Sequence, residues 1–169
     1  MIVTPLTVCE HVLTVVTSAL DAVGRKPARR LVTAGGLAVD DCEGGFLAVA
    51  PERVFRVGGA FPGEATNDDT VTGAMAVQVL ILAMVCVPTI DSAGNAPPIA
   101  DQQAAAAALL YDAACIWNTV NGEAILEPAW DDLTRASVSQ LFVGPEGGCG
   151  GSETRLTLGV SSLSWCLTE

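Results

Sequence analysis

The sequence predicts an α+β domain in which two main helices pack on a mostly antiparallel sheet and a β-hairpin closes the chain. Three observations support this prediction. Apolar residues recur at helical spacing in two segments, a long apolar run lies between these segments, and two alternating segments flank a glycine-rich turn near the C-terminus. The 169 residues have the size of one domain, so we expect residues 1–169 to form a single unit.

The first helix is expected over residues 5–23. Thr4 is a good cap residue, and Pro5 suits the first helical turn because its missing N–H is not needed there. Val8, Val12 and further apolar residues up to position 23 then recur at helical spacing. A glycine at position 24 ends the pattern, as glycine often does after a helix.

Two strands are expected in the first half of the chain, joined by an acidic, glycine-rich connection at 58–70 that we expect to be mobile. Residues 46–57 have the composition of a strand, with Pro51 at a break or an edge. Residues 71–87 form the longest apolar run. They are at the short limit for a membrane span and are interrupted by polar residues and glycine, so a strand buried on both faces is the favoured interpretation.

The second helix is expected from Pro98 to about Val120. Asp101 lies in the first turn, where a negative charge interacts well with the helix dipole, and the alanine run 104–108 favours helix. A wide apolar stripe follows and is expected to lie on the sheet. This stripe consists of Leu109, Ala113, Ile116 and Val120, with Leu110, Ala114 and Trp117 beside them.

The C-terminal part predicts a hairpin. Residues 136–143 and 153–167 alternate partly between apolar and polar side chains, and the glycine-rich segment 144–151 separates them as a turn. Residues 130–135 are expected to form a short helix. Residues 24–45 are longer and richer in glycine than a minimal domain needs, so we expect an arm or an extra hairpin there.

The charges are distributed unevenly. A net charge of −11 argues against binding of nucleic acid through a broad basic face, because such binding requires neutralisation of many phosphates. Half of the eight basic residues lie within one short segment. We expect this segment to contact the acidic surface of a neighbouring copy, with a solvated loop as the alternative. The predicted interface residues are Arg25, Lys26, Arg29, Arg30, Asp68 and Asp69.

The six cysteines do not suggest a metal site. No two lie closer than 17 positions, no CxxC motif is present, and the only histidine is His11. The N-terminus lacks the features of a secretory signal, so we expect reduced free thiols that behave as small core residues.

Residues that could carry chemistry are few. His11 has no nucleophile motif near it and is expected at a helix surface or an interface. The pairs at 40–41 and 68–69 are aspartates without the spacing of a calcium loop, and the segment 144–151 lacks the lysine and the hydroxyl residue of a phosphate loop. We therefore expect no catalytic residue, no cofactor and no metal ion. Three tryptophans are candidates for interface anchors or for core residues: Trp117, Trp130 and Trp165.

The order of these segments resembles the tail terminator proteins of long-tailed bacteriophages, which are also called tail tube capping or tail completion proteins. In that family an N-terminal helix precedes a strand, a long loop and a long strand, and a helix on the sheet and a final hairpin follow. The matching segments cover nearly the whole chain. They are TPLTVCEHVLTVVTSALDAV, FLAVAPERVFRV, GGAFPGEATNDDT, VTGAMAVQVLILAMVCV, PIADQQAAAAALLYDAACIWNTV and ETRLTLGVSSLSWCL.

The resemblance implies a structural, non-enzymatic protein of the virion, located in the tail or neck and assembled in the host cytoplasm. Such proteins form a hexameric ring that caps the tail tube, ends its growth and joins the tail to the head. The implied partners are further copies of the chain, the tail tube protein and the head–tail connector protein. DNA would be only a passing cargo in the ring, and no membrane is involved.

Three other functions stay open at this stage. The chain could be a different neck component, such as a head closure or tail completion protein. It could be a small α+β enzyme or ligand-binding domain, which would gain stability from its ligand. It could also be a cellular scaffold that forms oligomers without any phage role.

Overall fold

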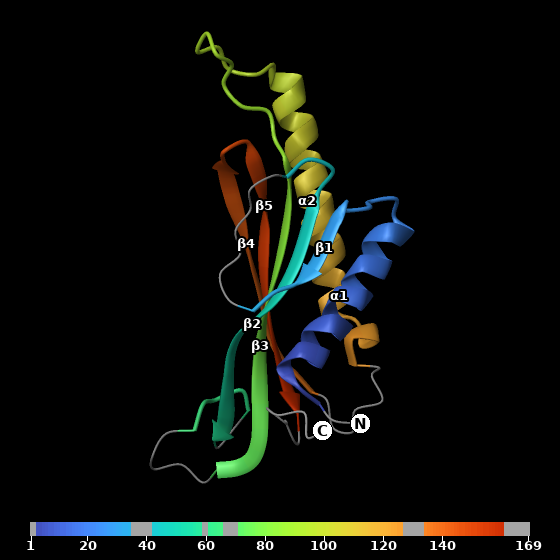
Figure 1. The fold of residues 1–169 in the computed structure, drawn as a ribbon, viewed down its shortest axis with the longest axis vertical. Helices are drawn as coiled ribbons and strands as arrows, with labels where there is room; N and C mark the ends of the chain where they lie inside the picture. The colour runs from blue at the N-terminus through green and yellow to red at the C-terminus, as the bar shows by residue number, and fades with distance from the viewer. Residues whose placement is uncertain (1–2, 35–41, 59–60, 66–70, 127–133, 161–169) are drawn as a thin grey trace.

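The computed structural model describes residues 3–34, 42–58, 61–65, 71–126 and 134–160. Its elements confirm the predicted α+β class with a mostly antiparallel sheet. In chain order they are α1 (Pro5–Ala22), β1 (Arg29–Val32), β2 (Phe46–Gly58), β3 (Val71–Cys86), α2 (Ile99–Asn121), the short 3₁₀ helix η1 (Glu123–Leu126), β4 (Thr134–Glu146) and β5 (Cys149–Val160). The five strands lie in the order β1-β2-β3-β5-β4, and both main helices cover one face of this sheet (Figure 1).

Helix α1 confirms the predicted first helix. The hydroxyl oxygen of Thr4 accepts a hydrogen bond from the backbone N–H of Thr7 at 3.1 Å, and the backbone N–H of Thr4 donates to the Thr7 hydroxyl at 2.9 Å. This reciprocal cap satisfies two backbone donors that a helix start otherwise leaves free. The buried face of α1 consists of Val8, Cys9, Val12, Val16 and Leu20.

Strand β3 is the centre of the sheet, paired with β2 on one side and β5 on the other. Val77, Val79 and Ile81 point to the helix-covered face and are fully buried in the main core. The predicted long strand is therefore confirmed, but it is not fully buried on both faces, because Gln78 and Leu80 on the other face are half-buried and Cys86 is exposed. No helix in the described ranges is both long and apolar enough to cross a membrane.

Strand β2 confirms the predicted strand, with a register shift directly after Pro51. Strand β1 pairs with β2 in parallel and lies in the region 24–45, of which residues 24–34 and 42–45 are described. The connection 58–70 is described at Gly58 and at 61–65, where Glu64 forms a bridge with Val57.

Helix α2 matches the predicted bounds, but the prediction that its whole apolar stripe lies on the sheet is wrong. Ala113, Ile116 and Val120 are buried, whereas Leu110 and Trp117 are 56% and 39% exposed. The first turns of α2 extend beyond the ends of β4 and β5 (Figure 1), so the sheet does not reach that part of the helix. In the C-terminal half of α2, only a narrow face contacts the sheet, and the side chains next to that face remain exposed.

The C-terminal hairpin is confirmed, but the predicted turn at 144–151 is too long. The strands continue to Glu146 and from Cys149, so the turn is Gly147-Gly148, both with positive φ, as a tight hairpin turn requires. Gly151 lies within β5, and this position requires glycine. A Cβ there would meet the carbonyl oxygen of Ala83 and would lie 2.6 Å from the sulfur of Met84. Here glycine marks close approach of two strands and not a turn.

The predicted short helix at 130–135 is wrong at its last two residues, because Thr134 and Arg135 begin β4. Residues 127–133 lie outside the described residues, as do 161–167 of the predicted final strand. The 3₁₀ helix η1 was not predicted. It buries Ile125 in the main core beneath α1 and α2.

The prediction of free thiols is wrong for two cysteines. Cys42 and Cys149 form a disulfide with a Cα–Cα distance of 5.8 Å across 107 positions of sequence. Strand β3 pairs with β2 on one side and with β5 on the other, and its end lies between the starts of these two strands. Residues remote in sequence therefore become neighbours. Cys9, Cys86 and Cys115 are free thiols, and Cys166 lies outside the described residues.

Candidate interaction surface

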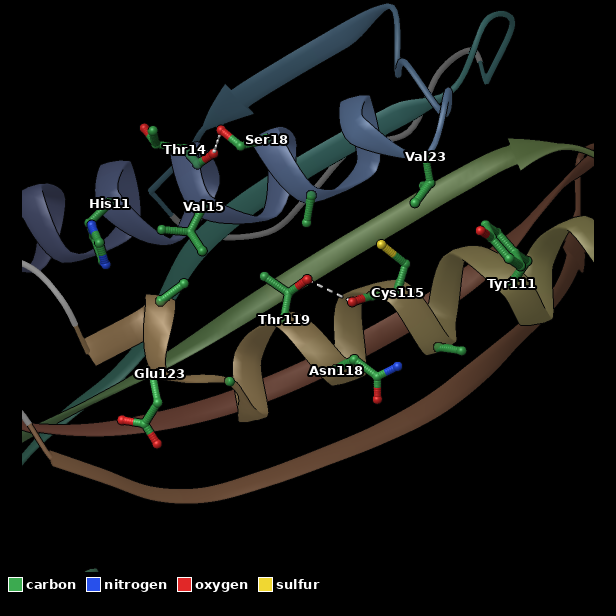
Figure 2. Close-up of a pocket in the computed structure, with 14 residues that line it drawn as sticks. His11, Thr14, Val15, Ser18, Val23, Tyr111, Cys115, Asn118, Thr119 and Glu123 are labelled. Carbon is green, nitrogen blue, oxygen red and sulfur yellow. Dashed lines mark hydrogen bonds between the residues drawn. The ribbon is translucent and has the colours of Figure 1, made fainter.

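A groove runs between α1 and α2 on the side of the helices away from the sheet (Figure 2). It has a volume of about 950 Å³ and is mostly apolar. Its lining includes His11, Val15 and Ala19 from α1, and Tyr111, Ala114 and Cys115 from α2. Burial in its wall raises the pKa of the Cys115 thiol.

Four polar side chains of the groove contact nearby backbone atoms. The hydroxyls of Thr14, Ser18 and Thr119 each donate to the carbonyl oxygen four residues earlier, at 2.7–2.9 Å. His11 lies with Nε2 3.2 Å from the carbonyl oxygen of Ile125, so this ring joins α1 to η1. These groups do not converge on a point in the groove, as the polar groups of a catalytic centre or a specific ligand site would.

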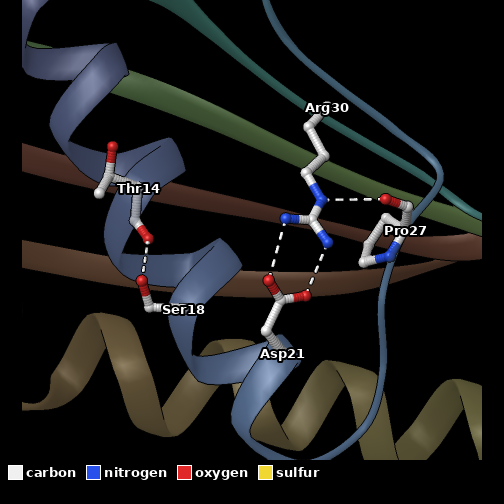
Figure 3. A network of polar contacts seen from close by, with 5 residues as sticks. All are labelled: Thr14, Ser18, Asp21, Pro27 and Arg30. Atoms are coloured by element: carbon white, nitrogen blue, oxygen red, sulfur yellow. Dashed lines mark hydrogen bonds and ion pairs between the residues drawn. The ribbon is translucent and has the colours of Figure 1, made fainter.

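The predicted basic interface segment, residues 25–30, runs from the loop after α1 into the first two residues of β1. Arg25 forms a two-pronged ion pair with Asp112 of α2 at 2.6 and 2.8 Å, and the Asp112 hydrogen bond raises the pKa of Arg25. Arg30 forms a similar pair with Asp21 at 2.6 and 3.0 Å and also donates to the carbonyl oxygen of Pro27 (Figure 3). Arg25 and Arg30 are therefore engaged by acids of the same chain.

The other predicted interface residues are placed differently. Arg29 lies over the ring of Phe46 at 5.0 Å from its centroid, and Lys26 is exposed. Asp68 and Asp69 lie outside the described residues, as do Asp40 and Asp41. The interface role of this set stays a prediction.

A second surface, which the sequence analysis missed, lies along β4 and the adjacent flank of α2. Strand β4 is at the edge of the sheet and pairs only with β5 among the described strands. Phe142 on this strand is 57% exposed. We call the outer edge of β4 together with Leu110, Trp117 and Phe142 the β4–α2 surface.

The side chain of Gln140 fixes the position of β4 against α2. Its Nε2 donates to the carbonyl oxygen of Ala113 at 3.0 Å and to the Thr154 hydroxyl at 2.8 Å. Phe142 is two residues further along the strand and therefore shares the helix-covered face with Gln140. Strand β4 runs opposite to α2 in Figure 1, so the part of β4 after Gln140 lies toward the N-terminal turns of α2.

One sequence signal could have revealed this surface. Leu141 and Phe142 belong to an apolar run, completed by Val143, in a strand that alternates only partly, so the run cannot lie wholly on the core side of the sheet. At the edge strand both are exposed, at 47% and 57%.

A comparison with known protein families and with curated proteins found no match to this chain. Among the described residues, no group of three or more His, Cys, Asp or Glu side chains is arranged to hold a metal ion. Of the three tryptophans, only Trp117 lies within the described ranges, and its partial exposure on the β4–α2 surface favours the interface interpretation over core packing.

Proposed function

We propose that this chain is a non-enzymatic subunit of a larger assembly, and specifically that it forms a ring that caps a phage tail tube and joins the tail to the head connector. The observation that carries the proposal is the β4 edge, which no other described strand covers and which exposed apolar side chains of α2 border. The order of elements, which resembles that of tail terminator proteins, supplies the phage part of the proposal.

The β4 edge has the properties of a site for a partner chain. Unpaired backbone N–H and C=O groups at a sheet edge readily pair with another chain, and monomeric proteins usually disrupt or cover such edges. Register shifts interrupt β4 only after Arg135 and after Val143, so residues 137–143 form a regular stretch. Aromatic residues are enriched in interface cores, and Trp117 and Phe142 provide them here.

The two edges of the sheet differ, which favours a ring over a symmetric dimer. The β4 edge is long and bordered by apolar side chains, whereas β1 at the opposite edge is short and carries Arg29 and Arg30. Contact between two unlike surfaces of successive copies is head-to-tail, and such contacts close into a ring when the rotation permits. In a hexamer of this kind, an acidic lumen would repel DNA and let it pass.

The experiment compares two charge substitutions at exposed apolar positions. Phe142→Asp places a carboxylate on the β4–α2 surface, while Ile90→Asp places one in the loop after β3, where Ile90 is 67% exposed. We expect Phe142→Asp to abolish assembly and Ile90→Asp to assemble like the parent protein, measured by light scattering after size exclusion. Circular dichroism confirms that both variants are folded. Equal assembly of the two variants would show that the β4–α2 surface is not the contact between copies.

The groove between α1 and α2 favours one second candidate, a binding domain for a small apolar molecule. Its volume is in the range of ligand pockets, although its polar groups do not converge. A bulky side chain in the groove, Ala19→Trp, should abolish any rise in melting temperature caused by an apolar ligand. Such a rise in a protein that stays monomeric would support this candidate against the ring.

A further inference from the structure

Three cysteine sulfurs meet at one end of the sheet. Cys42 is bonded to Cys149, and its Sγ lies 3.2 Å from the Sγ of Cys86. Cys86 and Cys149 are directly opposite each other in the β3–β5 register. The sulfur of Cys42 therefore lies beside a cross-strand cysteine pair and is within reach of both members.

The three cysteines differ in their access to solvent. Cys42 and Cys149 are 4% and 7% exposed, whereas Cys86 is exposed. A pocket of about 310 Å³ opens at this point, and Cys42, Cys86, Arg25 and Lys26 contribute to its lining. A small molecule can thus approach the free thiol next to the disulfide.

We propose that Cys42, Cys86 and Cys149 form a thiol–disulfide exchange site in which Cys42 alternates between two partners. In the forward step Cys86 loses its proton to solvent and its thiolate attacks the Sγ of Cys42. The Cys42–Cys149 bond breaks as the Cys42–Cys86 bond forms, and Cys149 leaves as a thiolate that takes a proton from solvent. The step has no net oxidation or reduction, and it follows the usual path of thiol–disulfide exchange.

The exchange changes which thiol is accessible. With Cys42 bonded to Cys149, the free thiol is the exposed Cys86, and with Cys42 bonded to Cys86 it is the buried Cys149. The external reactant that fits is a small disulfide that carries a carboxylate, because Lys26 lines the pocket, whereas Arg25 and Asp112 in the same lining are paired with each other. Attack of the Cys86 thiolate on such a disulfide forms a mixed disulfide at Cys86 and releases the other half as a thiolate. This site does not depend on the proposed ring.

Trypsin makes the two isomers distinguishable. Cleavage after Arg53, Arg56 and Arg135 leaves Cys42, Cys86 and Cys149 in three different peptides. Cys115 shares a peptide with Cys86, so the parent protein of this experiment and all its variants carry Cys115→Ser. The folded, oxidised protein is held without denaturant at mildly alkaline pH and quenched with acid. Its thiols are then alkylated, and the digest is read by mass spectrometry.

We expect both the Cys42–Cys149 and the Cys42–Cys86 peptide pairs from the parent protein, and loss of the second pair in the added variant Cys86→Ser. With Cys149→Ser, oxidation by oxidised glutathione should give the Cys42–Cys86 pair alone. Oxidised glutathione should also add to Cys86 in the parent, whereas in Cys86→Ser neither Cys42 nor Cys149 should carry glutathione. Absence of the Cys42–Cys86 pair from the parent overturns the proposal, even if Cys149→Ser can form that pair, because exchange requires all three sulfurs in one chain.

Discussion

The side-chain Nε2 of Gln140 on β4 donates a hydrogen bond to the backbone carbonyl oxygen of Ala113 on α2 at 3.0 Å. This contact joins the edge strand to the helix, and Phe142 lies two residues further along the same strand. The same Nε2 also donates to the hydroxyl of Thr154, which is fully buried.

Gln140→Ala should destabilise the fold by about 1–3 kcal/mol, because it leaves the buried Thr154 hydroxyl without this partner. The control is Gln102→Ala, which removes an exposed hydrogen bond to the carbonyl oxygen of Pro97 and should change stability by less than about 0.5 kcal/mol. Urea denaturation measures both. Equal effects would show that the Gln140 contact does not fix β4 against α2.

Gly151→Ala should destabilise the protein by about 1–3 kcal/mol or more, since the new Cβ would overlap the β3 backbone at Ala83. Gly144 is the matched control, because a Cβ there meets nothing within 4 Å. We expect Gly144→Ala to unfold at the same urea concentration as the parent within error. A Gly151→Ala protein of parental stability would contradict the β3–β5 register.

The Arg25–Asp112 pair should couple α2 to the segment before β1 by about 1 kcal/mol or less, because Arg25 is 37% exposed and solvent screens the pair. A double-mutant cycle with Arg25→Met and Asp112→Asn measures this coupling. The comparison pair Arg53–Glu64 is about half exposed on both sides and should give a coupling near zero. Added salt should weaken the Arg25–Asp112 coupling, and a coupling that is absent at low salt would argue against this ion pair.

Cys9 predicts a pH dependence of stability. Burial raises the pKa of its thiol from 9.0 to about 12. As the pH rises, the thiol ionises in the unfolded chain before it ionises in the folded protein. The contribution of the Cys9 thiol to the stability of the fold is therefore complete below pH 9.0 and is lost as the pH rises toward about 12. The parent protein should therefore lose stability over this range more steeply than Cys9→Ala. Parallel curves for the two proteins would contradict the burial of Cys9.

Much of the fold could be predicted because local sequence patterns report buried faces. The Thr4–Pro5 start and the apolar repeat identified α1, and the apolar run at 71–87 identified the central strand. Close approach is harder to predict. Gly150 and Gly151 look like turn residues, but they lie in a strand, where a side chain would crowd Val87 at Gly150 and would overlap the Ala83 backbone at Gly151. The Cys42–Cys149 disulfide depends on strand order, which no local pattern encodes.

The candidate surface was predicted less well than the fold. The charge cluster at 25–30 suggested an interface, but charges alone do not show that Arg25 and Arg30 are paired with Asp112 and Asp21. The apolar stripe of α2 suggested core packing, and its width hid the flank that the sheet leaves uncovered. Exposure depends on where the sheet ends, and that edge is set by pairing between distant strands.

The most direct test of the central claim is the mass of the purified protein in solution, with negative-stain images of the same sample, alone and with tail tubes from the same source. If the chain caps a tail tube, we expect closed rings near the hexameric mass, or a monomer that forms such rings only on tube ends. A monomer or dimer that stays unchanged in the presence of tubes, and that gains thermal stability from a small apolar molecule, would contradict it.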